Sequence, residues 1–300
     1  MDECSANNEL SKLIAQFHSQ KPIRSWSMLI SIFGDCVAPR GGELWMGNLV
    51  DLMQKIGVSS GVVRTAMSRL AADGWLERTR IGRNSFYRLT SMGREAFDLA
   101  SPRIYARGAV EWSGDWVMAL LSEGEDRASS RETLLSQGFG ALAPNVLVKP
   151  DRGEELPTST PLIMYMRSRS AAGMDTQLAG QAWTLDALQA GYESFIKTYQ
   201  ALYNLLQHDK ASSNLIAPET ALLIRIMLIH DLRRLVLRDP DLPTEALPRQ
   251  WSGNVAREMA AEIYNALKDL GEIWLDSNGK NAAGTLPSPS PVFFERFQPL

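Results

Sequence analysis

The sequence has few of the residues that build disulfides, metal sites and membrane spans. Its 300 residues include only two cysteines, Cys4 and Cys36, which is typical of a reduced, cytosolic protein without a disulfide framework. The three histidines, His18, His208 and His230, follow no metal-ligand spacing. No apolar run reaches the roughly 18 residues of a membrane span, and the N-terminus lacks the pattern of a signal peptide. These absences predict a cytoplasmic protein that binds neither metal nor membrane.

The sequence also lacks the motifs of common enzyme classes. It contains no GxxxxGK[ST] or GxGxxG phosphate loop, and the glycine pair in PRGGEL is not followed by the Lys-Ser of a P-loop. No GxSxG elbow for a nucleophile occurs. The neighbouring carboxylates Glu154 and Glu155 fall in an expected loop, where water would solvate them. The sequence therefore predicts a protein that is not an enzyme and needs no cofactor.

Charge is distributed unevenly along the chain. The whole sequence carries a net charge of −3, which does not suggest a nucleic-acid binder. Residues 21–110, however, hold 13 basic and 7 acidic side chains, a net charge of +6, and the remainder is at −9. The N-terminal third is thus a basic module on an acidic body.

Three short helices are predicted in this basic module from apolar residues at i, i+3, i+4 and i+7. The three stripes are Trp26, Leu29, Ile30 and Phe33; Leu49, Leu52, Met53 and Ile56; and Val63, Ala66, Met67 and Leu70. Gly57 is placed to end the second helix, Ser59 or Ser60 to cap the third, and Gly74 to end it. The short connection between the second and third helices predicts a helix-turn-helix.

A β-hairpin is predicted directly after these helices. WLERTR (75–80) and SFYRLT (85–90) alternate and carry aromatic residues, and IGRN (81–84) supplies a glycine for the turn. A helix-turn-helix followed by such a hairpin is a winged helix. PRGGEL is expected to form a turn and a short strand under the wing, and Ser91 to cap a closing helix over 91–100.

The rest of the chain predicts two further domains and a tail. A strand, helix, strand, strand order over 115–168 indicates a small ferredoxin-like α/β domain, and long helices follow over 183–207, 218–237 and 251–275. The expected fold is therefore mainly α with α/β parts, in four segments. These are a winged-helix DNA-binding domain at 21–110, a ferredoxin-like middle domain at 111–180, a helical C-terminal domain at 181–276 and a flexible tail at 277–300.

The third helix carries small and polar residues on the face opposite its apolar stripe. A helix that enters the DNA major groove needs small residues for close approach and a few donors for bases and phosphates. The predicted DNA-binding residues are Ser60, Gly61, Arg64, Thr65, Ser68 and Arg69, with Arg80 and Arg83 on the wing. A solvated helix face is the alternative, with Arg69 paired to Asp73. Arg88 is a further candidate for a phosphate contact.

Six segments of the chain together carry a family resemblance. The most specific is LISIFGDCVAPRGGELWMGNLV (29–50), with FGD followed by PRGG. The others are VRTAMSRLAADGW (63–75), GRNSFYRLT (82–90), RIYARGAVEWSGDW (103–116), GFGALAPNVLVKP (138–150) and RIMLIHDLRRLVLRDPDLPTEALPRQWSG (225–253). In these segments the sequence resembles the PaaX family, bacterial repressors of phenylacetate catabolism. One departure is Leu232, where the family often has an aromatic residue.

The resemblance implies a GntR-like winged helix and a homodimer on double-stranded operator DNA. It also implies release from that DNA when an aryl-CoA thioester, typically phenylacetyl-CoA, binds. The protein would then repress an aromatic-acid catabolic operon.

The best candidate for an effector site is the helix around IHDLRRLVLR. A helical wheel places His230, Arg233, Arg234 and Arg238 on one side, where they suit the phosphates of coenzyme A. The alternative is internal pairing with nearby aspartates, which are Asp231, Asp239 and Asp241. An aromatic stripe of Trp183, Tyr192, Phe195 and Tyr199 forms either an acyl pocket or plain core.

Two other functions stay open at this point. The first is an acyl-CoA-processing enzyme that carries a winged helix as a protein-interaction module. The second is an architectural DNA binder without an effector, which would show no operator preference.

Overall fold

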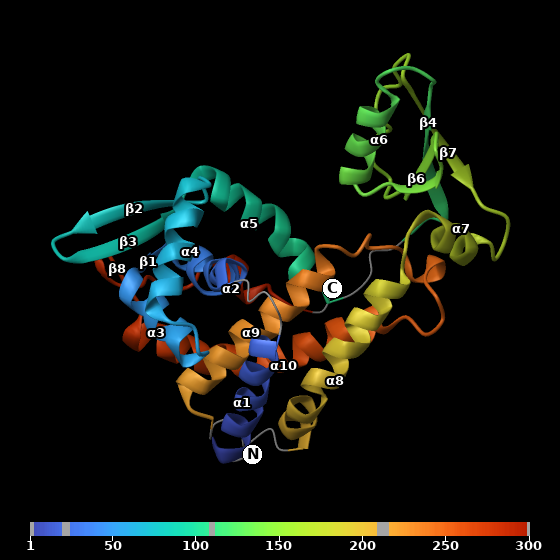
Figure 1. Cartoon of the computed structure of the whole chain (residues 1–300). Coiled ribbons are helices and arrows are strands. Elements are labelled where there is room, and N and C mark those ends of the chain that lie inside the picture. Colours follow the sequence, from blue (N-terminus) through green and yellow to red (C-terminus); the bar gives the residue numbers. More distant parts are fainter. Residues whose placement is uncertain (1–2, 20–24, 108–111, 209–215, 299–300) are drawn as a thin grey trace. The chain divides into compact units, whose positions relative to one another are not determined.

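The protein is described by a computed structural model that covers residues 3–19, 25–107, 112–208 and 216–298. It divides into two compact units (Figure 1). The first comprises residues 1–107, 194–237 and 256–300, and the second comprises residues 108–193 and 238–255. Helices dominate, and the described strands form small antiparallel sheets, so the chain is mixed α/β. The predicted domain limits at residues 21, 110 and 111 lie outside the described residues.

The basic module contains the predicted helices. They are α2 (Ser25–Ile32), α3 (Met46–Lys55) and α4 (Ser60–Ala72). The expected apolar stripe of α4 is confirmed, because Val63, Ala66, Met67 and Leu70 are its buried residues. Gly57 follows α3 with a φ of +81°, and Ser59 occupies the N-cap position of α4 without a side-chain cap hydrogen bond.

The predicted hairpin is also present. Strands β2 (Leu76–Ile81) and β3 (Asn84–Leu89) pair antiparallel around Gly82 and Arg83, and Gly82 takes the positive φ of the turn. PRGGEL leads into β1 (Glu43–Trp45), which pairs with the other edge of β3, as expected. The cap of α5 (Ser91–Ile104) differs from expectation, because Thr90 accepts a hydrogen bond from the Gly93 N–H.

The second unit is built on a four-stranded sheet in the order β5-β6-β4-β7. Its strands are β4 (Asp115–Leu121), β5 (Gly140–Ala143), β6 (Val146–Pro150) and β7 (Ile163–Arg169), with α6 (Arg127–Ser136) between β4 and β5. A ferredoxin-like domain has a second helix before its fourth strand. Here residues 151–162 form no helix, and α7 (Asp175–Ala182) follows β7 instead.

The predicted long helices are present. They are α8 (Asp186–His208), α9 (Pro218–Val236) and α10 (Ser252–Asn278), and α1 (Glu3–Ser19) precedes the basic module. Helix α9 is central to the first unit, because every residue from Thr220 to His230 is buried. Among the described residues, no helix has the length and hydropathy to cross a bilayer.

The prediction of a flexible tail over 277–300 is wrong for the described residues. They form the strand pair β8 (Lys280–Asn281) and β9 (Gly284–Thr285) and the short helix α11 (Pro291–Phe294). Phe293 and Phe297 are buried, and Arg296 reaches the core. The segment lacks periodicity because single large side chains, and not a helical face, hold it.

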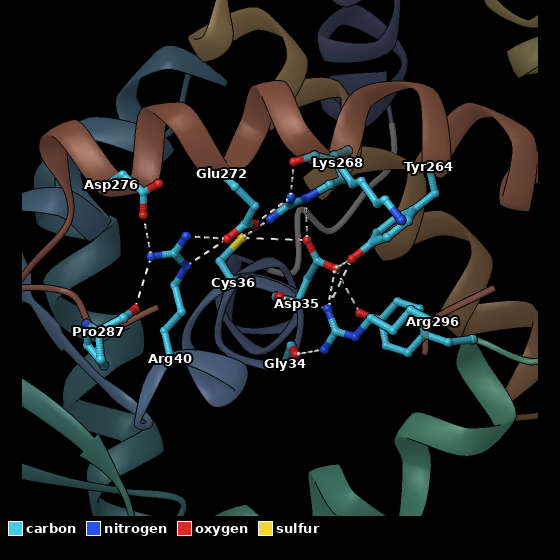
Figure 2. A network of polar contacts seen from close by, with 12 residues as sticks. Gly34, Asp35, Cys36, Arg40, Tyr264, Lys268, Glu272, Asp276, Pro287 and Arg296 are labelled. Atoms are coloured by element: carbon cyan, nitrogen blue, oxygen red, sulfur yellow. Dashed lines mark hydrogen bonds and ion pairs between the residues drawn. The ribbon is translucent and has the colours of Figure 1, made fainter. Parts of the chain in front are cut away.

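A buried carboxylate, Asp35, is the centre of the first unit (Figure 2). It lies in a π-helical turn, η1 (Phe33–Val37), directly after α2. Its Oδ2 accepts from Arg225 Nε at 2.9 Å, and its Oδ1 accepts from Arg296 Nη1 at 3.1 Å. The hydroxyls of Tyr105 and Tyr264 also donate to Oδ1, at 2.8 and 3.0 Å. Burial disfavours the carboxylate, but the two guanidinium groups outweigh it and hold the pKa of Asp35 below its usual value.

A second pair of ions extends the network to Arg40. Glu272 on α10 accepts from Arg225 Nη1 at 2.7 Å and from Arg40 Nε at 2.7 Å. Arg40 Nη1 also donates to Asp276 at 2.8 Å and to the carbonyl oxygen of Pro287 at 3.0 Å. The network thus joins the turn after α2 to α9, α10 and the C-terminal segment.

Replacing Asp35→Asn should destabilise the protein severely. The change leaves Arg225 and Arg296 buried without their anionic partner, and such losses cost about 3–5 kcal/mol. Urea unfolding of the full chain measures the effect. Asp98→Asn is the matched control, because Asp98 is exposed and should change stability by about 0.5 kcal/mol or less. Similar losses in both variants would contradict the central role of Asp35.

Candidate nucleic-acid interface

The outward face of α4 gathers the residues that the sequence singled out. Gly61, Arg64, Thr65, Ser68 and Arg69 are exposed, and Ser60 is half-buried at the start of the helix. The four central side chains, Arg64, Thr65, Ser68 and Arg69, border a shallow hollow together with Ala72. The structure therefore brings one set of small residues and donors onto a single accessible surface.

Gly61 is not required by the packing of α4. A Cβ atom added there would meet no other atom within 4 Å, and its φ is not positive. Gly93 gives the contrast, since a Cβ there would lie 2.4 Å from the carbonyl oxygen of Trp75. The packing of the fold therefore does not require glycine at residue 61, and the absence of a side chain leaves the exposed surface of the helix open there.

Local contacts leave these side chains accessible. Thr65 Oγ1 donates to the carbonyl oxygen of Gly61 at 3.1 Å. The alternative pairing of Arg69 is present as a loose contact of 3.8 Å to Asp73, with both side chains largely exposed. An exposed pair of this length contributes little, so Arg69 can exchange it for a phosphate at small cost.

The hairpin adds a second basic surface. Arg80 and Arg83 are exposed near its turn, and Arg80 Nε donates to the carbonyl oxygen of Gly82 at 3.1 Å. Arg78 also lies there, with its guanidinium on Ser85 Oγ at 2.8 Å, and the sequence analysis did not single it out. The alternation of side chains along a strand places Arg78 and Arg80 on the same side of β2, and this pattern could have identified Arg78. Arg88 differs, because its Nη2 pairs with Glu43 at 3.0 Å, which weakens it as a phosphate ligand.

Comparison with known proteins assigns the family. Residues 24–93 match the family described as PaaX-like protein, and residues 183–277 match the PaaX-like protein C-terminal domain. The chain is 34% identical over 305 residues to the transcriptional repressor PaaX of Escherichia coli (strain K12). The alignment covers 97% of this chain and 95% of the relative. The chain belongs to the PaaX family.

The predicted resemblance to the PaaX family is thereby confirmed. The relative's name describes a regulator, which supports the prediction of a protein that is not an enzyme. A solved structure, the uncharacterized protein Rv0674 from Mycobacterium tuberculosis, is similar with a TM-score of 0.50 and 23% identity. The match covers 76% of this chain and 89% of that chain, so it supports a shared fold.

The predicted effector residues of this PaaX-family chain differ in burial and ionisation, and they belong to two units. His230 is buried, and its Nδ1 lies 3.0 Å from Ser31 Oγ. Burial, with help from Arg233 and Arg234, lowers the pKa of His230 to about 3, so the imidazole is neutral at physiological pH. Arg238 lies in the turn after α9 and belongs to the second unit, and Arg234 is half-buried.

Arg233 is tied to α2. Its Nε donates to Ser31 Oγ at 2.7 Å, and its Nη2 donates to the carbonyl oxygen of Ser27 at 2.7 Å. Burial lowers the pKa of Arg233 to about 10, which leaves it charged at neutral pH. Ser31 therefore links Arg233 and His230 on α9 to α2.

The neighbouring aspartates and aromatic residues have their own partners. Asp231 accepts from Tyr199 at 3.0 Å, Asp239 from Tyr192 at 2.6 Å, and Asp241 from Arg152 at 3.0 Å. Tyr192, Phe195 and Tyr199 are buried, which favours the core interpretation of the aromatic stripe. Within the described residues, no group of three or more His, Cys, Asp or Glu side chains is arranged to hold a metal.

His230→Gln should change how stability depends on pH. The folded pKa of His230 is below the unfolded value, so the unfolded chain takes up a proton as the pH falls below about 6.5 while the folded chain does not. Each pH unit well below 6.5 costs the wild type about 1.4 kcal/mol that the variant does not lose, and the slope at pH 6.5 itself is about half of that. The stability of the wild type relative to the variant should therefore fall by about 1.6 kcal/mol between pH 6.5 and 5.

Urea unfolding of both proteins at the two pH values measures this difference. Asp231, whose pKa burial raises to about 6, has the opposite dependence but is present in both proteins. A difference between the two proteins that stays constant with pH would show that His230 titrates normally in the folded state.

Proposed function

We propose that the protein is a dimeric, cytoplasmic transcriptional repressor of an aromatic-acid catabolic operon of the phenylacetate type. An aryl-CoA thioester such as phenylacetyl-CoA would release it from operator DNA. The observation that carries the DNA-binding part is the outward face of α4, where an open Gly61 lies beside Arg64, Thr65 and Ser68. The relationship to a named transcriptional repressor supports the same conclusion.

The N-terminal module has the parts of a winged helix. Helices α2, α3 and α4 are followed by the β2–β3 hairpin, and β1 completes a three-stranded sheet. In such a module, the helix after the turn enters the major groove and the wing approaches the backbone or minor groove. We also propose a ferredoxin-like origin for the second unit, with the helix before its fourth strand replaced by the loop at 151–162.

Each exposed side chain then has a role on DNA. Arg64 can donate two hydrogen bonds to guanine, while Thr65, Ser68 and Ser60 contact phosphate or base edges. Arg69, Arg80 and Arg83 hold phosphates, and their counterion release makes binding strongly salt-dependent. The two α4 helices of a homodimer would read successive half-sites.

Fluorescence anisotropy tests the proposal directly. Purified protein is titrated onto labelled DNA from upstream of its own gene and of neighbouring catabolic genes, with scrambled DNA as control, at two salt concentrations. Sequence-dependent binding that phenylacetyl-CoA reverses is the expected result. Equal affinity for scrambled DNA would favour an architectural binder, and release of free coenzyme A by the pure protein would favour an enzyme.

Two arginine variants should separate base reading from phosphate binding. Arg64→Ala should weaken operator binding by about 1–3 kcal/mol and relax the preference for operator over scrambled DNA. Arg83→Ala should weaken both DNAs alike and reduce the salt slope by about one. Arg127→Ala, an exposed arginine on α6, is the control and should bind normally. Uniform weakening by Arg64→Ala would assign Arg64 to phosphate instead.

Gly61→Ala should stabilise the protein and weaken DNA binding at the same time. The added methyl group meets nothing in the fold, and alanine favours a helix over glycine by up to about 1 kcal/mol. If the backbone at residue 61 must approach DNA closely, the added methyl group keeps it away. The affinity for operator DNA should then fall by about tenfold or more. Gly180→Ala on α7 is the matched control, because its Cβ position is also open. Unchanged DNA affinity of Gly61→Ala would show that no close approach occurs at this residue.

A further inference from the structure

Val62 is an apolar side chain that α4 leaves exposed beside the residues proposed to bind DNA. It lies between Gly61 and the buried Val63, and it is 47% exposed. Within α4, all of whose residues the structure describes, Val62 is the one large apolar side chain that solvent reaches. The other exposed residues of the helix are small or polar, namely Gly61, Arg64, Thr65, Ser68, Arg69 and Ala72.

The fold itself does not favour valine at this position. The contact of this part of α4 with the core comes from Val63, which has no exposed surface. A β-branched side chain loses rotamer freedom in a helix, so valine is less favourable there than alanine. Single exposed apolar residues are common on protein surfaces, but this one lies on the helix that is proposed to enter the major groove. We therefore examined which partner its surroundings suit.

Thr65 extends the apolar surface of Val62. Residues three apart are neighbours on a helix, so the two β-branched side chains lie side by side. The hydroxyl group of Thr65 donates to the carbonyl oxygen of Gly61 at 3.1 Å, which uses its proton within the helix. The γ-methyl group of Thr65 is thus the part of this side chain that an apolar partner can contact. Val62 and Thr65 together form a small apolar spot.

The groups around this spot suit an anionic partner. Arg69 lies one turn beyond Thr65 and is largely exposed, and Arg64 is exposed on the same outward face. Gly61 leaves the surface open on the other side of Val62. The partner should therefore present an apolar group between negative charges. The major groove of DNA does so at thymine, whose C5-methyl group lies between two phosphate backbones, and no other base presents a methyl group there.

We propose that Val62, together with the methyl group of Thr65, contacts the C5-methyl group of a thymine in each operator half-site. This proposal deepens the function proposed above and rests on it. It adds an apolar base contact to the hydrogen bonds that Arg64 can donate to guanine. The contact discriminates between bases because it removes methyl groups from water, which cytosine and the purines cannot match. A thymine should therefore occupy one fixed position in each half-site.

Replacing thymine by uracil tests this contact. Deoxyuridine keeps the hydrogen-bonding groups of thymidine and lacks only the C5-methyl group. The full-length protein first selects its operator from random DNA, and anisotropy then compares the selected duplex with duplexes that carry deoxyuridine at one position of each half-site at a time. The wild type should lose about fourfold in affinity for each half-site at the contacted position, which corresponds to one buried methyl group. Other thymines should tolerate the change.

Val62→Ala assigns the effect to this side chain. The variant should bind the thymine operator about as weakly as the wild type binds the uracil operator, and its ratio of the two affinities should approach one. It should remain folded in urea unfolding, because residue 62 is exposed and alanine favours a helix. Val255→Ala on α10 is the matched control, since Val255 is 55% exposed, and it should keep the wild-type ratio.

The outcomes separate this proposal from the proposed function. A wild type that selects an operator but tolerates uracil at every position overturns the thymine contact and leaves the repressor function standing. An undiminished uracil effect in Val62→Ala also overturns the proposal, because another residue or the shape of the DNA then detects the methyl group. A protein that selects no operator overturns the proposed function, and the thymine contact with it.

Discussion

The buried charge of Asp35 is the constraint on which the first unit depends. A carboxylate with no exposure to solvent persists only when cations and donors surround it. Here these come from Tyr105 directly after α5, from α9, from α10 and from Arg296 beyond α11. Each of these elements must therefore take its place before the charge is compensated. A second ion pair, between Arg40 and Glu272, extends the network further along α10.

This network explains the most specific part of the sequence, FGD followed by PRGG. Gly34 makes room for the ring of Phe97, Asp35 holds the arginines, and Arg40 binds Glu272 and Asp276. Gly41 and Gly42 take φ values of +85° and +78°, which turn the chain from Arg40 into β1. The arginine and tyrosine partners of Asp35 are 70 to 261 residues away in the chain. No local pattern predicts such contacts, and only the family resemblance marked the segment.

The elements that the sequence predicted well are those with a local physical signal. The apolar stripe of α4, the glycine after α3 and the alternating strands of the hairpin each follow from a period or a turn residue. The predictions that were wrong concern residues whose contacts leave no such local signal. The residues 280–298 show no period, yet the isolated side chains of Phe293, Arg296 and Phe297 hold them in the core. The arginines of α9 lie on one side of a helical wheel, but tertiary contacts give them different surroundings. Arg233, for example, donates hydrogen bonds to Ser27 and Ser31 on α2.

The contacts of Asp35 and Arg40 indicate that the predicted domain limit at residue 110 does not enclose a complete core. A winged-helix domain cut at residue 110 would contain Asp35 and Arg40 but lack Arg225, Glu272 and Arg296, which compensate them. Its core would then hold an aspartate and an arginine without their ionic partners, a costly arrangement in an apolar interior. The outward face of α4 is therefore part of a larger body that includes α9 and the C-terminal segment.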